Sequence, residues 1–394
     1  MDTSVAMRRA RELARRALGR PADPVTPALP EALTELARRG PTVLGPTFGG
    51  ATDAALSVAV VMPSFRQGSG GHATIVHLAS ALAARGHAVS LWLEDFEQRH
   101  ARDGSALTGR QFVDWFGGAE LELHCDFSAW QGADVAVATG WQTVPRVLLL
   151  PGVSGRAYLV QDHEPEFYPT SAQSLFAAET YRQGLHCVAA SPWLAQLLRD
   201  RYGASSSSFD LAVDHAVYSP RDESRRDDTV AFYARAATPR RAVPLGLLAL
   251  GELTRRRPGA RIALFGGDAH ADFHHEALGT VRSADLATLY RQATVGMVFS
   301  LTNPSLVGLE MMACGLPCVE VDSEPMRASF GVAGPLRLTP PEPLTLCSTI
   351  EALLDDEAER RRLGDAGLAF VQGRTWSRAA EQVEAGLRHA LVPR

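Results

Sequence analysis

The chain has 394 residues, enough for roughly two domains of about 150 residues each. Its hydrophobic content of 46%, charged content of 21% and net charge of −5 at pH 7 describe a globular protein and argue against general nucleic-acid binding. No apolar run approaches the roughly 20 residues that span a bilayer, and the N-terminus lacks the hydrophobic core of a signal peptide. The five cysteines include no CxxC pair. We therefore expect a cytoplasmic protein without a disulfide framework.

Residues 1–55 are predicted to form an N-terminal extension. The first 20 residues hold six arginines against Asp2 and Glu12, and they predict an arginine-rich helix. Such a helix can lie on the anionic inner face of a membrane, as a peripheral contact. Because its apolar face is mostly alanine, a solvated helix is the favoured alternative. Residues 20–55 are rich in Pro, Gly and Ala and predict an irregular lead-in.

Residues 56–222 alternate between buried-strand runs and amphipathic helices. This alternation predicts a doubly wound α/β domain, with a parallel sheet covered by helices on both faces. The predicted strands are 56–63, 88–93, 134–139, 156–162 and 186–191, and the predicted helices are 72–86, 140–150, 172–183 and 192–202.

The loop PSFRQGSGG (63–71) follows the first predicted strand and opens the first predicted helix. Its glycines let a ligand approach the backbone, so Gly70 and Gly71 are candidates for a phosphate-facing loop. The loop does not match GxGxxG. A tight turn without a ligand, and a dinucleotide site that uses Glu94 or Asp95, remain alternatives.

The segment LVQDHEPEFYP (159–169) leaves a predicted strand with four titratable side chains close together. Such a cluster can supply a general base or a contact to an acceptor hydroxyl, which makes Asp162 and His163 candidate catalytic residues. A solvated charged loop is the alternative.

A polar, proline-containing break at 218–228 precedes a second alternation, predicted as an α/β domain over 223–374, with a C-terminal helix over 375–394. Two such domains leave a cleft in which ligands commonly bind. The predicted strands are 229–235, 261–267, 294–300 and 317–321; the predicted helices run to about 255, over 284–292 and 305–314, and from about 343 to 390.

FYARAATPRRAVPLG (232–246) places Arg235 at the end of a predicted strand and Arg240 and Arg241 at the start of a helix. The sequence contains no lysine, so an anion site here must use guanidinium groups, which bind phosphate in bidentate fashion. Arg235 and Arg241 are predicted to converge on a diphosphate. Ordinary surface arginines are the alternative.

NPSLVGLEMMACGLP (303–317) predicts a short helix that Asn303 or Ser305 caps and that Gly315 and Pro317 end. The unfilled N–H groups at the start of such a helix attract phosphate. The helix also carries one carboxylate, Glu310.

The histidines and acids of DAHADFHHEA (268–277) suggest a metal site, but their spacing matches no tight metal signature, and a polar surface loop is favoured. Cys314 and Cys318 are predicted to be small buried residues, and His77 a packed or solvated one.

Several of these segments, taken in order, resemble retaining glycosyltransferases of family 4, which have the GT-B fold of two Rossmann-like domains. The resemblance covers about residues 56–390. Its parts are GGHATIVHLASALAARGHAVSLW (70–92), YARAATPRRA (233–242), LFGGD (264–268), VRSADLATLYRQATVGMVFS (281–300), PSLVGLEMMACGLPCVE (304–320) and TWSRAAEQVEAGL (375–387). The last of these matches the family's closing helix, which crosses back to the first domain.

The resemblance implies roles for individual residues. Arg235 and Arg241 stand where the family grips the donor diphosphate, and Glu310 matches the second glutamate of the E-x7-E motif, which binds ribose hydroxyls. The remaining implied donor contacts are the phosphate amides of Ser305 and Leu306, the nucleobase contacts Val281 and Arg282, and the glycines Gly70, Gly71 and Gly267. His163, or its neighbour Asp162, falls near the family's active-site histidine.

The chain departs from the motif at Thr302, where the family has its first glutamate. That glutamate usually contacts sugar hydroxyls, so its absence disfavours a glucose- or mannose-type donor. The segments QDHEPEFYP and YARAATPRR most resemble those of bacterial rhamnosyltransferases of surface-glycan assembly. This resemblance implies dTDP-rhamnose as the donor and a glycan or glycolipid as the acceptor. It implies no cofactor or metal. A UDP- or GDP-hexose transferase, a sugar phosphorylase or epimerase, and a non-catalytic nucleotide-binding subunit remain alternatives.

Overall fold

The computed structural model describes residues 31–45, 54–96, 98–100, 104–221 and 223–392. The chain divides into two compact units, Met1–Gly40 and Pro41–Arg394. The described part of the first unit is the helix α2 (Glu31–Arg39) and the residue after it, so the predicted irregular lead-in is wrong over these residues. Glu31 in the first turn of α2 and Arg38 and Arg39 in its last turn favour a helix, because they complement the helix dipole. The arginine-rich helix predicted over residues 1–20 lies outside the described residues.

The first sheet of the second unit has seven strands in the order β3-β2-β1-β4-β5-β6-β7, and every pair is parallel. β1 and β4 bury four or more consecutive residues, as expected for strands covered on both faces. The strands are β1 (Ser57–Pro63), β2 (Ala88–Glu94), β3 (Glu122–His124), β4 (Ala133–Ala138), β5 (Val153–Val160), β6 (His186–Ala189) and β7 (Ser206–Ser208). The helices between them are α3 (Gly70–Ala84), α4 (Gly104–Phe116), α5 (Val144–Leu149), α6 (Ala172–Thr180) and α7 (Pro192–Tyr202), with 3-10 turns at Trp141–Thr143 and Glu164–Phe167.

The second sheet has six parallel strands in the order β10-β9-β8-β11-β12-β13. In both sheets the chain reverses its direction of winding beside the first strand, between β1 and β4 and between β8 and β11. The strands are β8 (Thr229–Tyr233), β9 (Arg261–Phe265), β10 (Glu276–Gly279), β11 (Val295–Met297), β12 (Cys318–Val321) and β13 (Leu336–Thr339). The helices are α8 (Val243–Arg256), α9 (Ser283–Gln292), α10 (Leu306–Ala313), α11 (Glu324–Phe330), α12 (Pro343–Asp355), α13 (Glu357–Val371) and α14 (Trp376–His389), with a 3-10 turn at Pro239–Arg241.

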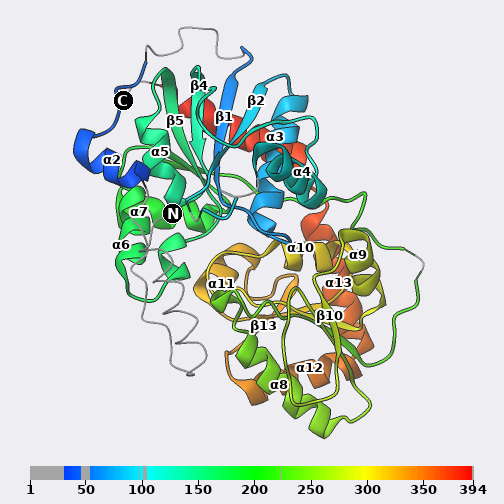
Figure 1. Ribbon diagram of the computed structural model, residues 1–394. Coiled ribbons are helices and arrows are strands. Elements are labelled where there is room, and N and C mark those ends of the chain that lie inside the picture. The colour runs from blue at the N-terminus through cyan, green and yellow to red at the C-terminus, as the bar shows by residue number, and fades with distance from the viewer. Residues whose placement is uncertain (1–30, 46–53, 97, 101–103, 222, 393–394) are drawn as a thin grey trace, which may run out of the picture. The chain divides into compact units, whose positions relative to one another are not determined.

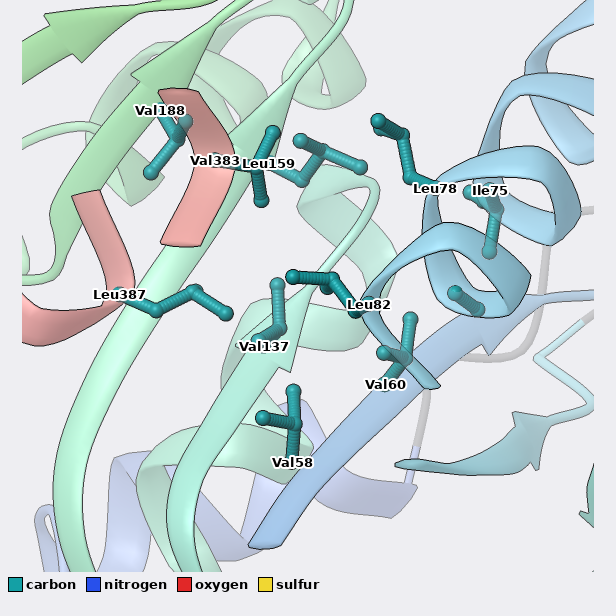
Figure 2. A pocket seen from close by; sticks show the side chains of 11 residues that line it. Val58, Val60, Ile75, Leu78, Leu82, Val137, Leu159, Val188, Val383 and Leu387 are labelled. Atoms are coloured by element: carbon teal, nitrogen blue, oxygen red, sulfur yellow. The ribbon is translucent and has the colours of Figure 1, made fainter. Parts of the chain in front are cut away.

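The last helix, α14, leaves the second sheet and packs beside α3 and the strands β5 to β7 of the first (Figure 1). Val383 and Leu387 face Leu82 and Val137 around a small apolar cavity of about 20 Å³ (Figure 2). Since the lining is entirely apolar, this cavity is a packing gap rather than a polar ligand site.

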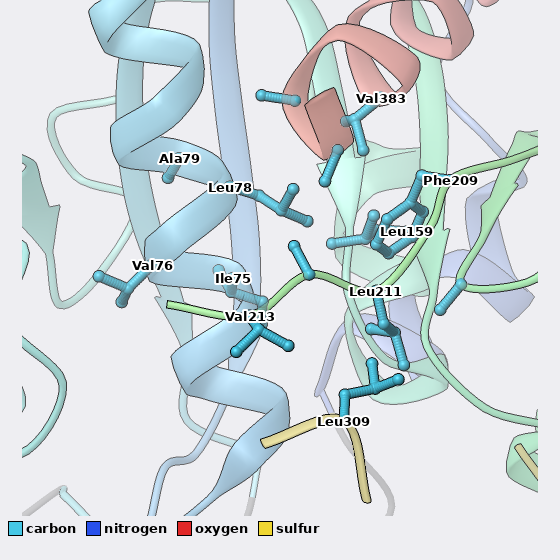
Figure 3. Packing of buried hydrophobic residues seen from close by; sticks show 14 of the residues in the cluster. Ile75, Val76, Leu78, Ala79, Leu159, Phe209, Leu211, Val213, Leu309 and Val383 are labelled. Atoms are coloured by element: carbon cyan, nitrogen blue, oxygen red, sulfur yellow. The ribbon is translucent and has the colours of Figure 1, made fainter. Parts of the chain in front are cut away.

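One buried apolar cluster joins the two sheets. The segment between β7 and β8 contributes Phe209, Leu211 and Val213, which lie between α3 and α14 (Figure 3). Leu309 of α10 packs into the same cluster beside Leu211. The residues at the start of α10 are thus anchored to the core of the first sheet.

The predicted α/β alternation is confirmed, but the helix α4 and several shorter elements were not predicted: β3, β7, β10, α11 and β13. The three-residue strands are too short to show a hydrophobic period. No helix in the described part of the chain has the length and apolarity that crossing a bilayer requires. The five cysteines are free thiols, and Cys314 and Cys318 are buried as predicted.

Candidate functional site

A cleft of about 660 Å³ lies between the carboxyl ends of the two sheets. Its volume is in the range of small-molecule sites, and this edge of a parallel sheet is where ligands bind. We call the lining residues between Pro63 and Phe167 the first-sheet half, and those between Tyr233 and Glu310 the second-sheet half. Leu211 and Tyr218, from the connecting segment, lie between the halves.

Both predicted diphosphate ligands, Arg235 and Arg241, line the second-sheet half. Nη1 of Arg241 donates to the carbonyl of Phe299, at 3.2 Å, and to the hydroxyl of Ser300. Nη1 of Arg235 donates to the carbonyl of Gly68, 2.8 Å away. Within the described part of the chain, the other donors of both guanidinium groups have no protein partner, so each group keeps donors for an anion.

Arg241 is connected through Ser300 to a buried carboxylate. Glu320, 2% exposed, accepts hydrogen bonds from the backbone N–H groups of Ser300 and Val321, both at 2.9 Å. Burial raises the pKa of Glu320 to about 8, against the opposing effect of these hydrogen bonds and of the Arg241 charge. Burial also lowers the pKa of Arg241, which nevertheless stays a cation at neutral pH. The Glu320 carboxylate thus fixes the backbone of Ser300, whose hydroxyl accepts a hydrogen bond from Arg241.

The start of α10 opens onto the same half of the cleft. Ser305 is the N-cap residue, and its hydroxyl accepts from the N–H of Val307 at 3.3 Å. The N–H of Leu306 has no partner among the described residues, and Ser305 and Leu306 both line the cleft. A helix start with an unfilled donor beside two guanidinium groups suits a phosphate.

Glu310, one turn further along α10, also lines the cleft. Burial raises the pKa of Glu310 to about 7, and the nearby Tyr218 hydroxyl opposes this rise. Val281 and Arg282, predicted to hold a nucleobase, line the cleft just before α9. Tyr218 was not predicted, because it falls in the stretch that the sequence marks only as a break.

The glycine loop reaches the cleft as predicted, with Gly70 and Gly71 in the first turn of α3. Gly68 has a φ of +71°, and a Cβ there would lie 3.2 Å from Nη1 of Arg235, so the loop approaches the second sheet at this point. Gly267 is not among the lining residues; its neighbour Gly266 lines the cleft instead. β9 ends at Phe265, and Gly266 turns there with a φ of +95°.

Asp162 lines the cleft, but both of its carboxylate oxygens are occupied. Oδ1 accepts from the backbone N–H of His163, at 2.9 Å, and of Asn303, at 3.1 Å; Oδ2 accepts from Nε of Arg240, at 3.0 Å. Asn303 adds a bond from Nδ2 to the carbonyl of Gln161, at 3.0 Å, and accepts one from the Ser191 hydroxyl, at 2.8 Å. We call Asp162, Arg240 and Asn303 the polar bridge, because they join the two halves of the cleft.

The structure does not bring His163 to the cleft. Its side chain is fully buried, with Nε2 2.7 Å from the Tyr202 hydroxyl and Nδ1 2.9 Å from Oε1 of Glu166. Thr302 is also buried and absent from the lining, and its hydroxyl has no partner in the described structure. No side chain at the first motif position therefore reaches into the cleft.

Glu164 is a lining residue that the sequence analysis named only as part of a cluster. Its carboxylate accepts from the Tyr158 hydroxyl, at 2.6 Å, and from the N–H of Trp141, at 2.7 Å. Burial raises the pKa of Glu164 to about 7, so a fraction of the molecules carry a neutral acid there at neutral pH.

Two alternatives lose support. Glu94 pairs with Arg146 at 2.6 Å, and Asp95 accepts from the Ser64 hydroxyl at 2.6 Å; neither lines the cleft, as a dinucleotide site would require. The described residues contain no group of three or more His, Cys, Asp or Glu side chains placed to hold a metal, and residues 268–277 all belong to that part. His77 stacks on Trp376, with ring centroids 4.6 Å apart.

The polar bridge predicts a loss of stability when Asp162 is removed. We expect Asp162→Ala to lower the free energy of unfolding by about 2 kcal/mol, because two charged-acceptor hydrogen bonds between the sheets are lost. In a double-mutant cycle with Arg240→Ala, the double variant should lose less than the sum of the single variants. Denaturant unfolding of the wild type and of the three variants measures these free energies. Arg255→Ala, which breaks a solvent-exposed pair, is the control, and additive losses would contradict the bridge.

Comparison with known proteins gives matches to both sequence and fold. Residues 228–329 match the family model described as "WsaF, C-terminal domain". The chain is 31% identical over 273 residues to the O-antigen biosynthesis protein RfbC of Myxococcus xanthus, covering 66% of this chain and 21% of that protein. It is 29% identical over 231 residues to the D-inositol 3-phosphate glycosyltransferase of Frankia alni, covering 50% of this chain and 56% of that enzyme. The chain thus spans from about a fifth to just over half of these relatives' lengths.

Solved structures share the architecture at low sequence identity. Sucrose-phosphate synthase from Thermosynechococcus elongatus superposes with a TM-score of 0.63 at 17% identity, over 84% of this chain and 98% of that one. Anabaena HepE in complex with UDP and glucose gives a TM-score of 0.62 at 14% identity, over 85% and 100%. The chain accordingly has the GT-B fold, with two parallel-sheet α/β domains.

Proposed function

We propose that the protein is a retaining glycosyltransferase, which moves a sugar from a nucleoside diphosphate sugar to a hydroxyl of a glycan or glycolipid. The observation that carries this proposal is the second-sheet half of the cleft. There, two guanidinium groups with unused donors, an open helix start and a half-buried carboxylate lie at the carboxyl ends of parallel strands. Diphosphate and ribose hydroxyls are the groups that such a set binds.

In this proposal each part of the donor meets a distinct group. Arg235, Arg241 and the N–H of Leu306 hold the diphosphate, Glu310 accepts hydrogen bonds from the ribose hydroxyls, and Val281 and Arg282 border the base. Guanidinium charge stabilises the departing diphosphate, which is the role that a divalent ion plays elsewhere. We therefore propose a reaction that needs neither metal nor cofactor.

The proposed reaction replaces one bond at the anomeric carbon. The bond from that carbon to the diphosphate oxygen breaks, and its electron pair leaves with the diphosphate. The acceptor oxygen bonds to the same face of the sugar, and its proton passes to the departing diphosphate. A double displacement would need two carboxylates about 5–5.5 Å apart, one of them acting as the nucleophile. The sequence assigns no carboxylate to that role. Same-face attack is therefore preferred.

For the donor we favour dTDP-L-rhamnose over a UDP- or GDP-hexose. The support is the resemblance to rhamnosyltransferases of surface-glycan assembly, the RfbC relative with its O-antigen name, and the absence of a motif glutamate at Thr302. We further propose cytoplasmic action; peripheral membrane contact through the arginine-rich residues 1–20 is the alternative to a solvated segment there. The alternative of a non-catalytic nucleotide-binding subunit shares the same donor site.

A panel of dTDP-, UDP- and GDP-sugars tests the proposal. We expect dTDP-rhamnose to raise the thermal midpoint most, since selective binding stabilises the folded state by mass action. Release of dTDP with labelled sugar transferred to an acceptor, or to water, would exclude the non-catalytic alternative. If no sugar nucleotide changes the midpoint or is turned over, the proposed function is wrong.

Donor binding should depend on pH through Glu310. The sugar hydroxyl of the nucleoside donates best to the charged carboxylate, whose pKa is raised to about 7 in the free protein. Binding therefore weakens as pH falls through 7, and affinity for dTDP-rhamnose should rise about tenfold from pH 6 to pH 8. Isothermal titration calorimetry measures this. Glu310→Gln should flatten the profile, and a profile equally steep in that variant would contradict the assignment.

A further inference from the structure

The two halves of the cleft differ in charge. The second-sheet half contains four arginines and one carboxylate. The first-sheet half contains no arginine, and its titratable side chains are Asp114, Asp162, Glu164 and His72. His72 is neutral at pH 7, because burial lowers its pKa to about 4. The lining of the first-sheet half therefore supplies carboxyl groups and no cation, and Arg240, which reaches it from the second-sheet half, is paired with Asp162 and lies over the Phe167 ring.

Two aromatic side chains at the end of α4 line this half. Trp115 remains 36% exposed although it lies in the cleft wall, and Phe116 is half-buried beside it. Their rings pack on Phe65, which is 1% exposed, with centroid distances of 5.8 Å and 6.1 Å and nearly perpendicular planes. The platform is thus fixed from behind while one side stays open to the cleft.

The neighbours of this platform are polar but not basic. The His72 ring lies 5.6 Å from Phe116, and its hydrogen bonds go to the Ser69 hydroxyl and the Pro63 carbonyl. Asp114 lines the cleft next to Trp115, and Gln142 lines it from the turn after β4. An open aromatic face bordered by carboxylate and amide groups suits a sugar ring, whose C–H face is apolar and whose hydroxyls form hydrogen bonds.

We propose that Trp115, Phe116 and Asp114 form the acceptor subsite, and that it takes an uncharged sugar residue of the acceptor glycan rather than a phosphorylated one. The inference rests on the proposed transferase function and adds the chemical class of the second substrate. It separates this chain from the Frankia alni relative, whose name specifies inositol 3-phosphate. A phosphate in the first-sheet half would face Asp114 and Glu164 without a cation from that half.

The test is saturation-transfer NMR on the full chain in the presence of saturating dTDP. The neutral probes are the methyl glycosides of rhamnose, glucose, galactose and N-acetylglucosamine, and the anionic probe is D-inositol 3-phosphate. We expect transfer to at least one neutral glycoside and none to the inositol phosphate. Trp115→Ala should reduce the glycoside signal at least tenfold, whereas Trp115→Phe should retain part of it.

Leu107→Ala is the matched control. Leu107 lies on the same helix, is 40% exposed and is absent from the cleft lining, so its removal should leave the glycoside signal unchanged. Equal or stronger transfer to inositol 3-phosphate, no transfer to any glycoside, or an unchanged signal in Trp115→Ala would overturn the proposal. So would weaker dTDP binding in Trp115→Ala, because it would place the platform in the donor site. Failure of the wild-type chain to bind dTDP would instead count against the proposed function.

Discussion

Replacing Arg241 with alanine is expected to lower kcat/KM for sugar transfer by about 100- to 1000-fold. The side chain lines the cleft from the 3-10 turn Pro239–Arg241 that follows β8, and it donates hydrogen bonds to Phe299 and Ser300. If it stabilises the departing diphosphate, its removal takes away charge that matters most in the transition state. Arg241→Lys should recover only part of the rate, because lysine lacks the planar fork. Steady-state kinetics with dTDP-rhamnose measures both variants.

Two controls separate this effect from misfolding. Arg255→Ala removes an exposed arginine on α8 that is absent from the cleft lining, and it should leave kcat/KM unchanged. The thermal midpoint of Arg241→Ala without ligand shows whether the buried guanidinium also supports the fold. A variant that is folded and retains more than a tenth of the wild-type rate would remove Arg241 from the proposed site.

Replacing Glu310 with alanine should weaken dTDP binding by about 10- to 100-fold. The deoxyribose of dTDP has one free hydroxyl, and a hydrogen bond from it to a carboxylate contributes about 1.5–3 kcal/mol. The Glu310 carboxylate lines the cleft, and among the described residues only the nearby Tyr218 hydroxyl interacts with it, so it retains acceptor capacity. Calorimetric titration with dTDP gives the dissociation constant of each variant.

Glu310→Gln keeps the shape and one acceptor oxygen, so it should fall between wild type and alanine. Tyr218→Phe is the matched control: it removes the hydroxyl near Glu310 and leaves the carboxylate in place. We expect Tyr218→Phe to change the affinity much less than Glu310→Ala. Unchanged affinity in Glu310→Ala would show that the ribose binds elsewhere.

The sequence could predict the long, periodic elements and the second-sheet half of the cleft. Buried strands such as β1 and β8 are continuous apolar runs, and Ser305 with the glycine after α10 marks that helix at both ends. The resemblance to the glycosyltransferases predicted the role of Glu310, whereas Arg235 and Arg241 were predicted because strand ends and helix starts fix where a nearby side chain lies. Local pattern is sufficient for residues of this kind.

The polar bridge and the aromatic platform could not be predicted in this way. The contact between Asp162 and Arg240 joins residues 78 positions apart, and no local pattern encodes it. Asp162 therefore looked like a candidate base, although its carboxylate is committed to Arg240 and Asn303. The position of Trp115 depends on its packing against Phe65, a contact between residues 50 positions apart that the sequence does not reveal.

The most direct test of the donor site is a crystal structure of the chain with bound dTDP. The account predicts both phosphates within hydrogen-bond distance of the guanidinium groups of Arg235 and Arg241 and of the N–H of Leu306, with the sugar hydroxyl of the nucleoside on Glu310. A nucleotide bound in the first-sheet half, or phosphates that leave both arginines with protein contacts alone, would contradict it.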